Sequence, residues 1–223
     1  MLVQKEIITK KIFTDRVRSH IADNKWEDLI KLFPGAEEAG VANTLLKSAS
    51  RKVGEYLYSS KRYYEAIIFS NKARSRDPKT KSTFNLFVNS LQMFFNENVE
   101  EFSQKDLSEF KQAILPIIDF HKLKFPAHRK IVDSTDHMFR RIDYRIKYVV
   151  KEVEESKVTF RVQQIKNSLY GDMTSEEVQQ EFARLLVPKL RERLDEEENS
   201  EEEKKNSKKK PNGKKKKGKK KDK

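Results

Sequence analysis

Two aspartates and a histidine lie close together in the chain and are the residues best suited to bind a metal ion. They are Asp133, Asp136 and His137. Asp133 and His137 are four residues apart, so in a helix they would share one face and could both reach an ion. A protein site for zinc needs about four ligands, and no further ligand at a suitable spacing accompanies these two. We therefore predict no metal site, and ion pairs with Arg140 or Arg141 instead.

No sequence motif for phosphoryl transfer or nucleophilic hydrolysis is present. The 223 residues contain no glycine-rich phosphate loop, no HExxH, no GxSxG and no cysteine. We predict a protein that is not an enzyme and needs no cofactor. No apolar run approaches the roughly 20 residues that span a bilayer, and the first residues lack the apolar block of a signal peptide. We expect an intracellular protein, cytoplasmic or nuclear.

The net charge of +13 is concentrated in one terminal segment. Residues 204–223 contain 13 Lys and one Asp, so the rest of the chain carries 35 basic and 34 acidic residues. Residues 195–203 contain seven acidic residues, and nothing apolar follows Leu194. Such a segment cannot bury enough apolar surface to offset the entropy of ordering, so we predict a disordered tail. Arguments for nucleic-acid binding must then rest on the tail rather than on the domain.

The tail lysines have several potential uses. They could bind RNA or DNA phosphates through counterion release, act as a nuclear localisation signal, touch acidic proteins or lipid head groups, or only solubilise the chain. The absence of Arg and aromatic residues from 204–223 argues against base stacking or bidentate base recognition. The lysines predicted to bind a polyanion are Lys208, Lys209, Lys210, Lys214, Lys215, Lys216, Lys217, Lys219, Lys220 and Lys221.

Any functional residue in the rest of the chain would be positioned by helices. Gly and Pro are few, six of each, and apolar residues recur at spacings of three and four, whereas no stretch alternates as a strand would. Pro34-Gly35 is expected to end the second helix and Asp77-Pro78 the fourth. The first five predicted helices cover residues 3–21, 26–33, 42–60, 63–76 and 80–96.

Three further helices follow from capping signals and apolar spacing. Ser103 and Asp106 form a capping-box pattern at the start of one helix. One long helix is expected over 128–158, with an apolar seam that could also face a second copy. Gly171-Asp172 marks a helix stop, and a last helix is expected from Thr174.

Small residues recur where two of the predicted helices would meet. Gly54 lies in the first helix, and Ala66 and Ala73 lie one heptad apart in the second. Together with Pro78, the pattern over residues 47–81 resembles a tetratricopeptide repeat (TPR), a family of roughly 34-residue helix pairs. The resemblance implies a right-handed helical repeat of antiparallel hairpins with a surface that binds other proteins. The residues it assigns to repeat packing are Val53, Gly54, Leu57, Ala66, Ala73 and Pro78.

The segments that flank this unit match the repeat less well. Phe87-Val88 stands where the apolar-glycine pair should recur, so the next two helices are expected to lie further apart. A lone repeat cannot bury its apolar faces, and the flanking helices must therefore complete the core.

The resemblance also implies a groove lined by the first helix of the unit and by the helix that follows it. The predicted groove residues are Ser48, Arg51, Glu55, Tyr58, Asn85 and Asn89. Arg51 could serve as one basic member of the clamp with which some TPR proteins hold a chaperone's C-terminal carboxylate. Glu55 would repel such a peptide end, so this use is not predicted. A plain solvated face is the alternative.

Four tyrosines close to this unit form a further candidate anchor for a partner. They are Tyr56, Tyr58, Tyr63 and Tyr64, and we predict that they form an exposed cluster.

From these features combined, we predict an all-α protein with a TPR-like helical domain over 1–190 and a disordered charged tail over 191–223. The predicted function is a protein-protein interaction adaptor whose polybasic tail adds electrostatic binding or nuclear targeting. The alternative is an RNA-, DNA- or ribosome-associated protein that binds phosphates through the tail. The oligomeric state is left open.

Overall fold

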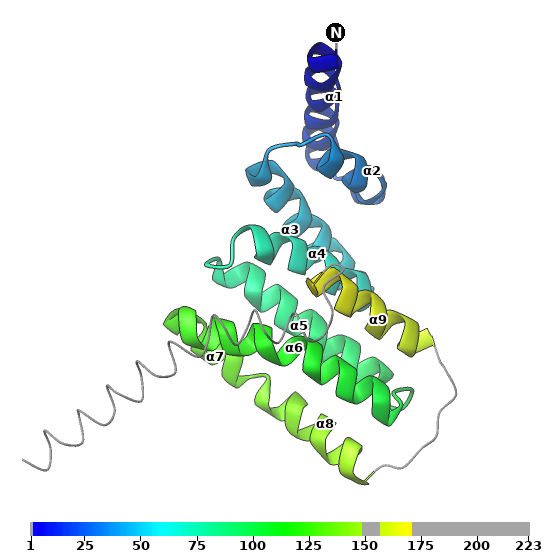
Figure 1. The fold of residues 1–223 in the computed structure, drawn as a ribbon, viewed down its shortest axis with the longest axis vertical. Helices are drawn as coiled ribbons and strands as arrows, with labels where there is room; N and C mark the ends of the chain where they lie inside the picture. Colours follow the sequence, from blue (N-terminus) through cyan, green and yellow to red (C-terminus); the bar gives the residue numbers. More distant parts are fainter. Residues whose placement is uncertain (1, 149–156, 171–223) are drawn as a thin grey trace, which may run out of the picture. The chain divides into compact units, whose positions relative to one another are not determined.

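The computed structural model describes residues 2–148 and 157–170, and within them the regular secondary structure is helical, without strands (Figure 1). The predicted all-α class is confirmed. The described helices are α1 (Leu2–Ala22), α2 (Trp26–Glu38), α3 (Asn43–Ser59), α4 (Tyr63–Arg76), α5 (Lys81–Asn98), α6 (Gln104–Lys124), the short 3-10 helix η1 (Pro126–His128), α7 (Arg129–Asp133), α8 (Asp136–Tyr148) and α9 (Lys157–Tyr170). Among them, no helix has the length and apolar content needed to cross a membrane.

The prediction that Pro34-Gly35 ends the second helix is wrong, because α2 continues to Glu38. The apolar side chains Leu29 and Phe33 are buried on one face of α2. Burial of apolar residues before and after Pro34 in the sequence outweighs the one backbone hydrogen bond that a proline removes. Gly35 gives α1 room to approach: a Cβ there would lie 2.7 Å from the ring of Phe13.

Helices α3 and α4 form the hairpin at the centre of the molecule's first apolar cluster. Their predicted bounds are confirmed to within one residue, and Lys61, with a φ of 59°, makes the left-handed turn between them. α4 has apolar residues on both sides, so it belongs to two clusters. Ala66 and Phe69 pack toward α2 and α3, whereas Tyr63 and Ile67 pack toward α5 and α6.

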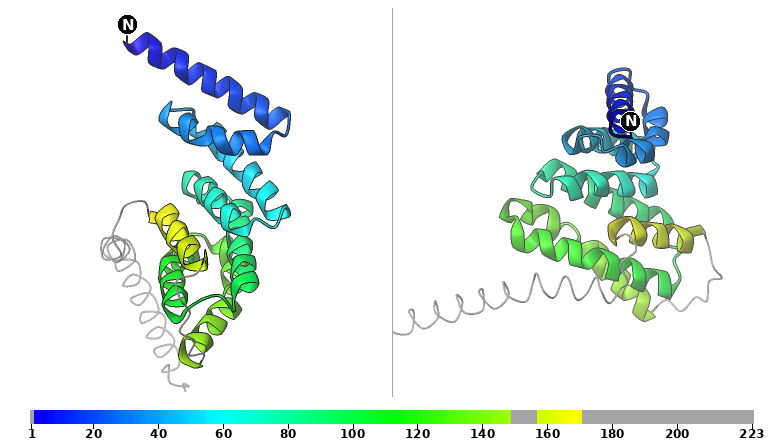
Figure 2. Two further views of the ribbon diagram at one scale, coloured as in Figure 1. Left: turned by 90° about the vertical axis from the view of Figure 1, so that its right-hand side faces the viewer. Right: turned by 45° about the horizontal axis from the view of Figure 1, so that its top comes forward.

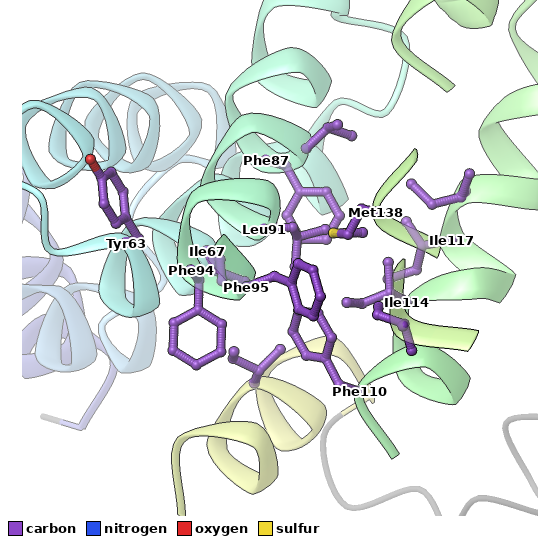
Figure 3. Packing of buried hydrophobic residues seen from close by; sticks show 14 of the residues in the cluster. Tyr63, Ile67, Phe87, Leu91, Phe94, Phe95, Phe110, Ile114, Ile117 and Met138 are labelled. Carbon is purple, nitrogen blue, oxygen red and sulfur yellow. The ribbon is translucent and has the colours of Figure 1, made fainter. Parts of the chain in front are cut away.

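The second cluster is largely aromatic and fills the space between α5 and α6. Phe94 of α5 meets Phe110 of α6 with ring centroids 5.9 Å apart, and Phe102 contacts both. Figure 3 shows Phe94, Phe95 and Phe110 among the buried side chains of this cluster. The α5 and α6 backbones approach each other sparsely, whereas α4 is close to both α3 and α5. The predicted wider spacing of the helix pair after Pro78 is therefore confirmed.

Helix α9 packs against α4 and α6, far from it in sequence (Figure 2). Its buried residues are Val158, Val162 and Ile165. The Nδ2 of Asn71 donates to the Ser168 carbonyl (2.7 Å), and the Thr159 hydroxyl donates to Asp106 (3.1 Å). Asp106 also completes the predicted capping box with Ser103, which is confirmed. The helix stop predicted at Gly171-Asp172 lies outside the described residues, which end at Tyr170.

The predicted long helix over 128–158 is wrong, because the chain breaks at Ser134-Thr135 between α7 and α8. The hydroxyls of both residues donate to carbonyls three residues earlier, and the Ser134 carbonyl accepts from Gln92 of α5 (2.8 Å). The described part of the apolar seam is buried within the chain: Ile131, Met138 and Ile142 belong to the second cluster. The predicted helix from Thr174, the boundary at 190/191 and the tail over 191–223 lie outside the described residues, as do all its lysines.

Candidate interaction surface

Gly54 of the repeat-like unit lies where α3 and α4 cross. Ala66 and Ala73 are fully buried, and so are Val53 and Leu57. A Cβ on Gly54 would lie 3.4 Å from the backbone nitrogen of Ser70 and 3.2 Å from a methyl group of Leu86. The backbone that Gly54 faces is therefore that of Ser70, one turn after Ala66. Pro78 is half-buried just beyond the end of α4.

A large residue at Gly54 should destabilise the domain. We expect Gly54→Leu to lower the free energy of unfolding by about 1–3 kcal/mol, because the branched side chain meets the α4 backbone, which cannot move aside as a flexible side chain can. Gly54→Ala should be close to neutral, since a small shift of Leu86 relieves its contact and alanine favours the helix by about 1 kcal/mol. Urea unfolding measures both changes. As a control, Ser48→Leu adds the same side chain at an exposed site, and an equal loss there would contradict the close crossing.

The residues predicted to line a groove belong to two neighbouring helices, and we call them the α3–α5 face. They are Ser48, Arg51, Glu55 and Tyr58 of α3, and Asn85 and Asn89 of α5. Because Leu86 reaches Gly54, α3 and α5 lie against each other. None of the six residues is buried: three are exposed and three are half-buried.

Two of these residues have neighbours that limit what they can do. Arg51 lies 3.5 Å from the carboxylate of Glu55, so its charge is already partly compensated. The ring of Tyr58 packs edge-on against Tyr63, with centroids 5.4 Å apart. Asn85 and Asn89 keep amide groups that can donate and accept hydrogen bonds.

The prediction of an exposed tyrosine cluster is wrong. Tyr63 is buried in the second cluster, and burial raises its pKa. Tyr56 packs on Trp26 and donates to Glu27 (3.1 Å), whereas Tyr64 packs on Phe94. Apart from the Tyr58–Tyr63 contact, the rings point to different neighbours, and the four do not present one shared surface.

Asp133, Asp136 and His137 do not lie in one continuous helix. The break at Ser134-Thr135 separates Asp133 from His137, which were expected to share one helical face. In residues 2–148 and 157–170, no three His, Asp or Glu side chains gather as the ligands of a metal would. Arg141 donates to Asn96 of α5 (2.6 Å), a neutral partner in place of the predicted ion pair.

A buried relay of basic side chains, absent from the sequence-based predictions, joins four segments of the chain. The Nη1 of Arg74 in α4 lies 3.5 Å from the Nε2 of His121 in α6. The Nδ1 of His121 lies 2.9 Å from the Nδ1 of His128 in η1. The Nε2 of His128 lies 3.2 Å from the carbonyl of Lys79, in the α4–α5 connection. The ring of Phe84 stacks on His121, with centroids 3.7 Å apart, and on His128.

The relay fits one pattern of hydrogens with both histidines neutral. The Lys79 carbonyl only accepts, so the Nε2 of His128 carries a hydrogen, and its Nδ1 accepts from the Nδ1–H of His121. The Nε2 of His121 is then free to accept from Arg74, whose guanidinium only donates. A second proton on either ring would place two N–H groups opposite each other.

The surroundings of the relay oppose that second proton. Burial, together with the charge of Arg74, lowers the pKa of His121 to about 3, and burial also lowers the pKa of His128. Burial lowers the pKa of Arg74 to about 10, so it remains charged at neutral pH. Its guanidinium also donates to Asn71 and lies over the ring of Phe87, 5.3 Å from the ring centroid.

Neither histidine stands in a recognisable motif, and the partners of each are distant in sequence. The one local indication is that both histidines lie near the end of α6. His121 is in its last turn, and His128 is two residues after Pro126.

The geometry of α3, α4 and α5 fits the resemblance to a tetratricopeptide repeat, which depends on Gly54, Ala66 and Ala73. Membership of that family stays a prediction. Comparisons of the chain with protein-family models, with curated proteins and with solved structures find no match.

Proposed function

We propose that this chain is a non-catalytic adaptor that binds a protein partner on the α3–α5 face. The observation that carries the proposal is the close crossing of α3 and α4 at Gly54, with Leu86 of α5 in the same contact. Contact between α3 and α5 supports the proposal, because unburied residues of both helices could then reach one ligand. A rigid helical scaffold presents such a surface without an ordering cost on binding.

The composition of the face favours an extended peptide segment as its ligand. Ser48, Asn85 and Asn89 are neutral groups that can hydrogen-bond to a peptide main chain, in both donor and acceptor roles. The Arg51–Glu55 pair has no net charge, so the face should not select strongly acidic or basic segments. Binding through the main chain would give modest affinity, with specificity left to side chains near Tyr58.

Arginine substitutions on the face test the adaptor function. We expect Asn85→Arg/Asn89→Arg in the full-length protein to lose at least about tenfold in the recovery of nuclease-resistant partners, because two bulky cations displace the amides from the main chain of the ligand. Affinity purification with quantitative mass spectrometry measures the recovery.

The matched control is Gln112→Arg/Gln163→Arg, which makes the same change at exposed glutamines of α6 and α9. Unfolding curves should be alike for all three proteins. If wild type, face variant and control recover the same proteins in the same amounts, the α3–α5 face does not bind the partner.

Binding of nucleic acid or another polyanion is the second candidate function. It is favoured by the 13 lysines of residues 204–223, which together could neutralise many phosphates. A weak tail interaction linked to a weak interaction on the α3–α5 face would raise the affinity for a ribonucleoprotein through effective concentration.

A further inference from the structure

Charge is unevenly distributed along α5 and α6, although the chain outside its tail is nearly neutral. The two helices run antiparallel, since Phe94 meets Phe110 while Phe84 meets His121. The start of α5 therefore lies beside the end of α6. We call the exposed cations gathered there the basic end: Lys79, Lys81, Lys122, Lys124, Arg129 and Lys130.

The opposite end of α5 is richer in acidic residues, although Arg145 of α8 pairs with Glu100 (2.9 Å) and Lys105 follows at the start of α6. Residues 82–104 contain no basic residue, and the exposed Glu97, Glu100 and Glu101 lie at the end of α5 and in the loop that follows. The net charge of the chain before the tail is thus nearly zero, although the charges are separated along α5.

The buried relay fixes the segments that carry the basic end. His128 contacts the Lys79 carbonyl, and both histidines stack on Phe84, so the α4–α5 connection, the end of α6 and η1 are held together. α7 follows η1 directly and also packs on α5 and α6. Cations from separate segments are thereby kept in one place by contacts below the surface.

Carboxylates near the basic end compensate little of its charge. Asp77 is already engaged, since it accepts from Lys47 (2.9 Å) and from Thr80 (2.7 Å). Asp119 is half-buried near Lys122, and Asp133 follows Arg129 by four residues. Even without Lys124, the other five exposed cations outnumber these two carboxylates and leave a local excess of positive charge.

We propose that the basic end is a sequence-independent binding surface for the phosphate backbone of nucleic acid, carried by the folded domain and separate from the tail and from the α3–α5 face. Five of its six cations are lysines, which act as point charges toward phosphates and cannot recognise bases by a bidentate fork. Large exposed apolar side chains occur at Ile12, Leu115, Tyr144, Tyr148 and Phe160 among the described residues, and none of these belongs to the basic end.

A membrane-bound surface would need such apolar side chains to insert between lipids, so nucleic acid is favoured over an anionic membrane. An acidic protein would most often be held by arginines in bidentate pairs, whereas this surface has only Arg129. Affinity should come from release of counterions by each phosphate neutralised, with a strong dependence on salt.

Charge reversal at the basic end of the full-length protein tests the proposal. We expect Lys122→Glu/Arg129→Glu to weaken binding of a short fluorescein-labelled RNA duplex about tenfold at physiological salt. The plot of log K against log salt should flatten by about 1.5–2 units, because about one unit is lost with each phosphate contact. The matched control is Arg16→Glu/Lys31→Glu, which makes the same charge change at exposed residues of α1 and α2. Fluorescence anisotropy measures both quantities, with unfolding curves to show that all proteins are folded.

Each outcome separates the basic end from other sources of affinity. A loss in the charge-reversed variant with less than about a twofold change in the control supports the proposal. Equal losses in both variants would show that only net charge matters, and no loss in either would assign binding to the tail alone; both results overturn the proposal. A tenfold loss of binding to polyglutamate or to phosphatidylserine vesicles, with RNA binding unchanged, would also overturn it. Recovery of partners by the α3–α5 face should not change, so failure here leaves the adaptor function untouched.

Discussion

Phe84→Ala is expected to lower the free energy of unfolding by about 3–5 kcal/mol, the usual cost of removing a fully buried aromatic ring. Phe84 has no exposed surface and stacks on both histidines of the relay, in a near-parallel arrangement with His121 (interplanar angle 2°). Truncation would leave a cavity and would admit water to the side chains that hold η1 against α5. Urea unfolding followed by circular dichroism measures the loss.

Phe160→Ala is the matched control for this prediction, because Phe160 is 65 % exposed on α9 and its truncation should cost less than about 0.5 kcal/mol. Phe84→Leu keeps more of the buried volume and should lie between wild type and Phe84→Ala. This milder variant preserves the ranking if the alanine variant does not fold. Equal stability of Phe84→Ala and Phe160→Ala would mean that the relay is not held by ring stacking.

Local signals were sufficient for the central part of the fold. The short break at Lys61-Arg62, the stop before Pro78 and the capping box at Ser103 each act within a few residues, so the bounds of α3, α4 and the start of α6 could be predicted. The α3–α5 face could likewise be predicted as unburied, because the apolar positions of α3 fix which side of that helix turns inward.

Features that depend on distant contacts could not be predicted in this way. Helix α2 passes through Pro34 because of what Phe33 packs against, and α7 ends where Gln92 of α5 binds the Ser134 carbonyl. The relay joins residues 47 and 49 positions apart, and its histidines look unremarkable in the sequence. The basic end could not be predicted for the same reason, because its cations come from segments that only the antiparallel arrangement of α5 and α6 brings together.

Acid should destabilise the domain through the relay, and this is the second large effect that we expect. The folded-state pKa of His121 is about 3, well below the value near 6.5 of an unfolded chain, and the pKa of His128 is also lowered. The unfolded state therefore binds more protons below about pH 6.5. Stability is fully present above that pH and is lost as the pH falls from there toward the folded-state values. The expected loss is about 1.4 kcal/mol per pH unit for His121, and His128 adds to it.

Substituting one histidine at a time separates the relay from the other titrating groups. His121→Gln retains a side-chain oxygen that can accept from Arg74 and an amide that can donate to His128, but it cannot take up a proton. The fall in unfolding free energy between about pH 7 and pH 5 should therefore be smaller in this variant by about 1–2 kcal/mol than in wild type. His137→Gln is the control, because His137 is exposed and lies outside the relay. An identical pH dependence in wild type and in both variants would show that His121 gains its proton as easily in the folded chain as in the unfolded one, and hence that Arg74 and His128 do not hold it neutral.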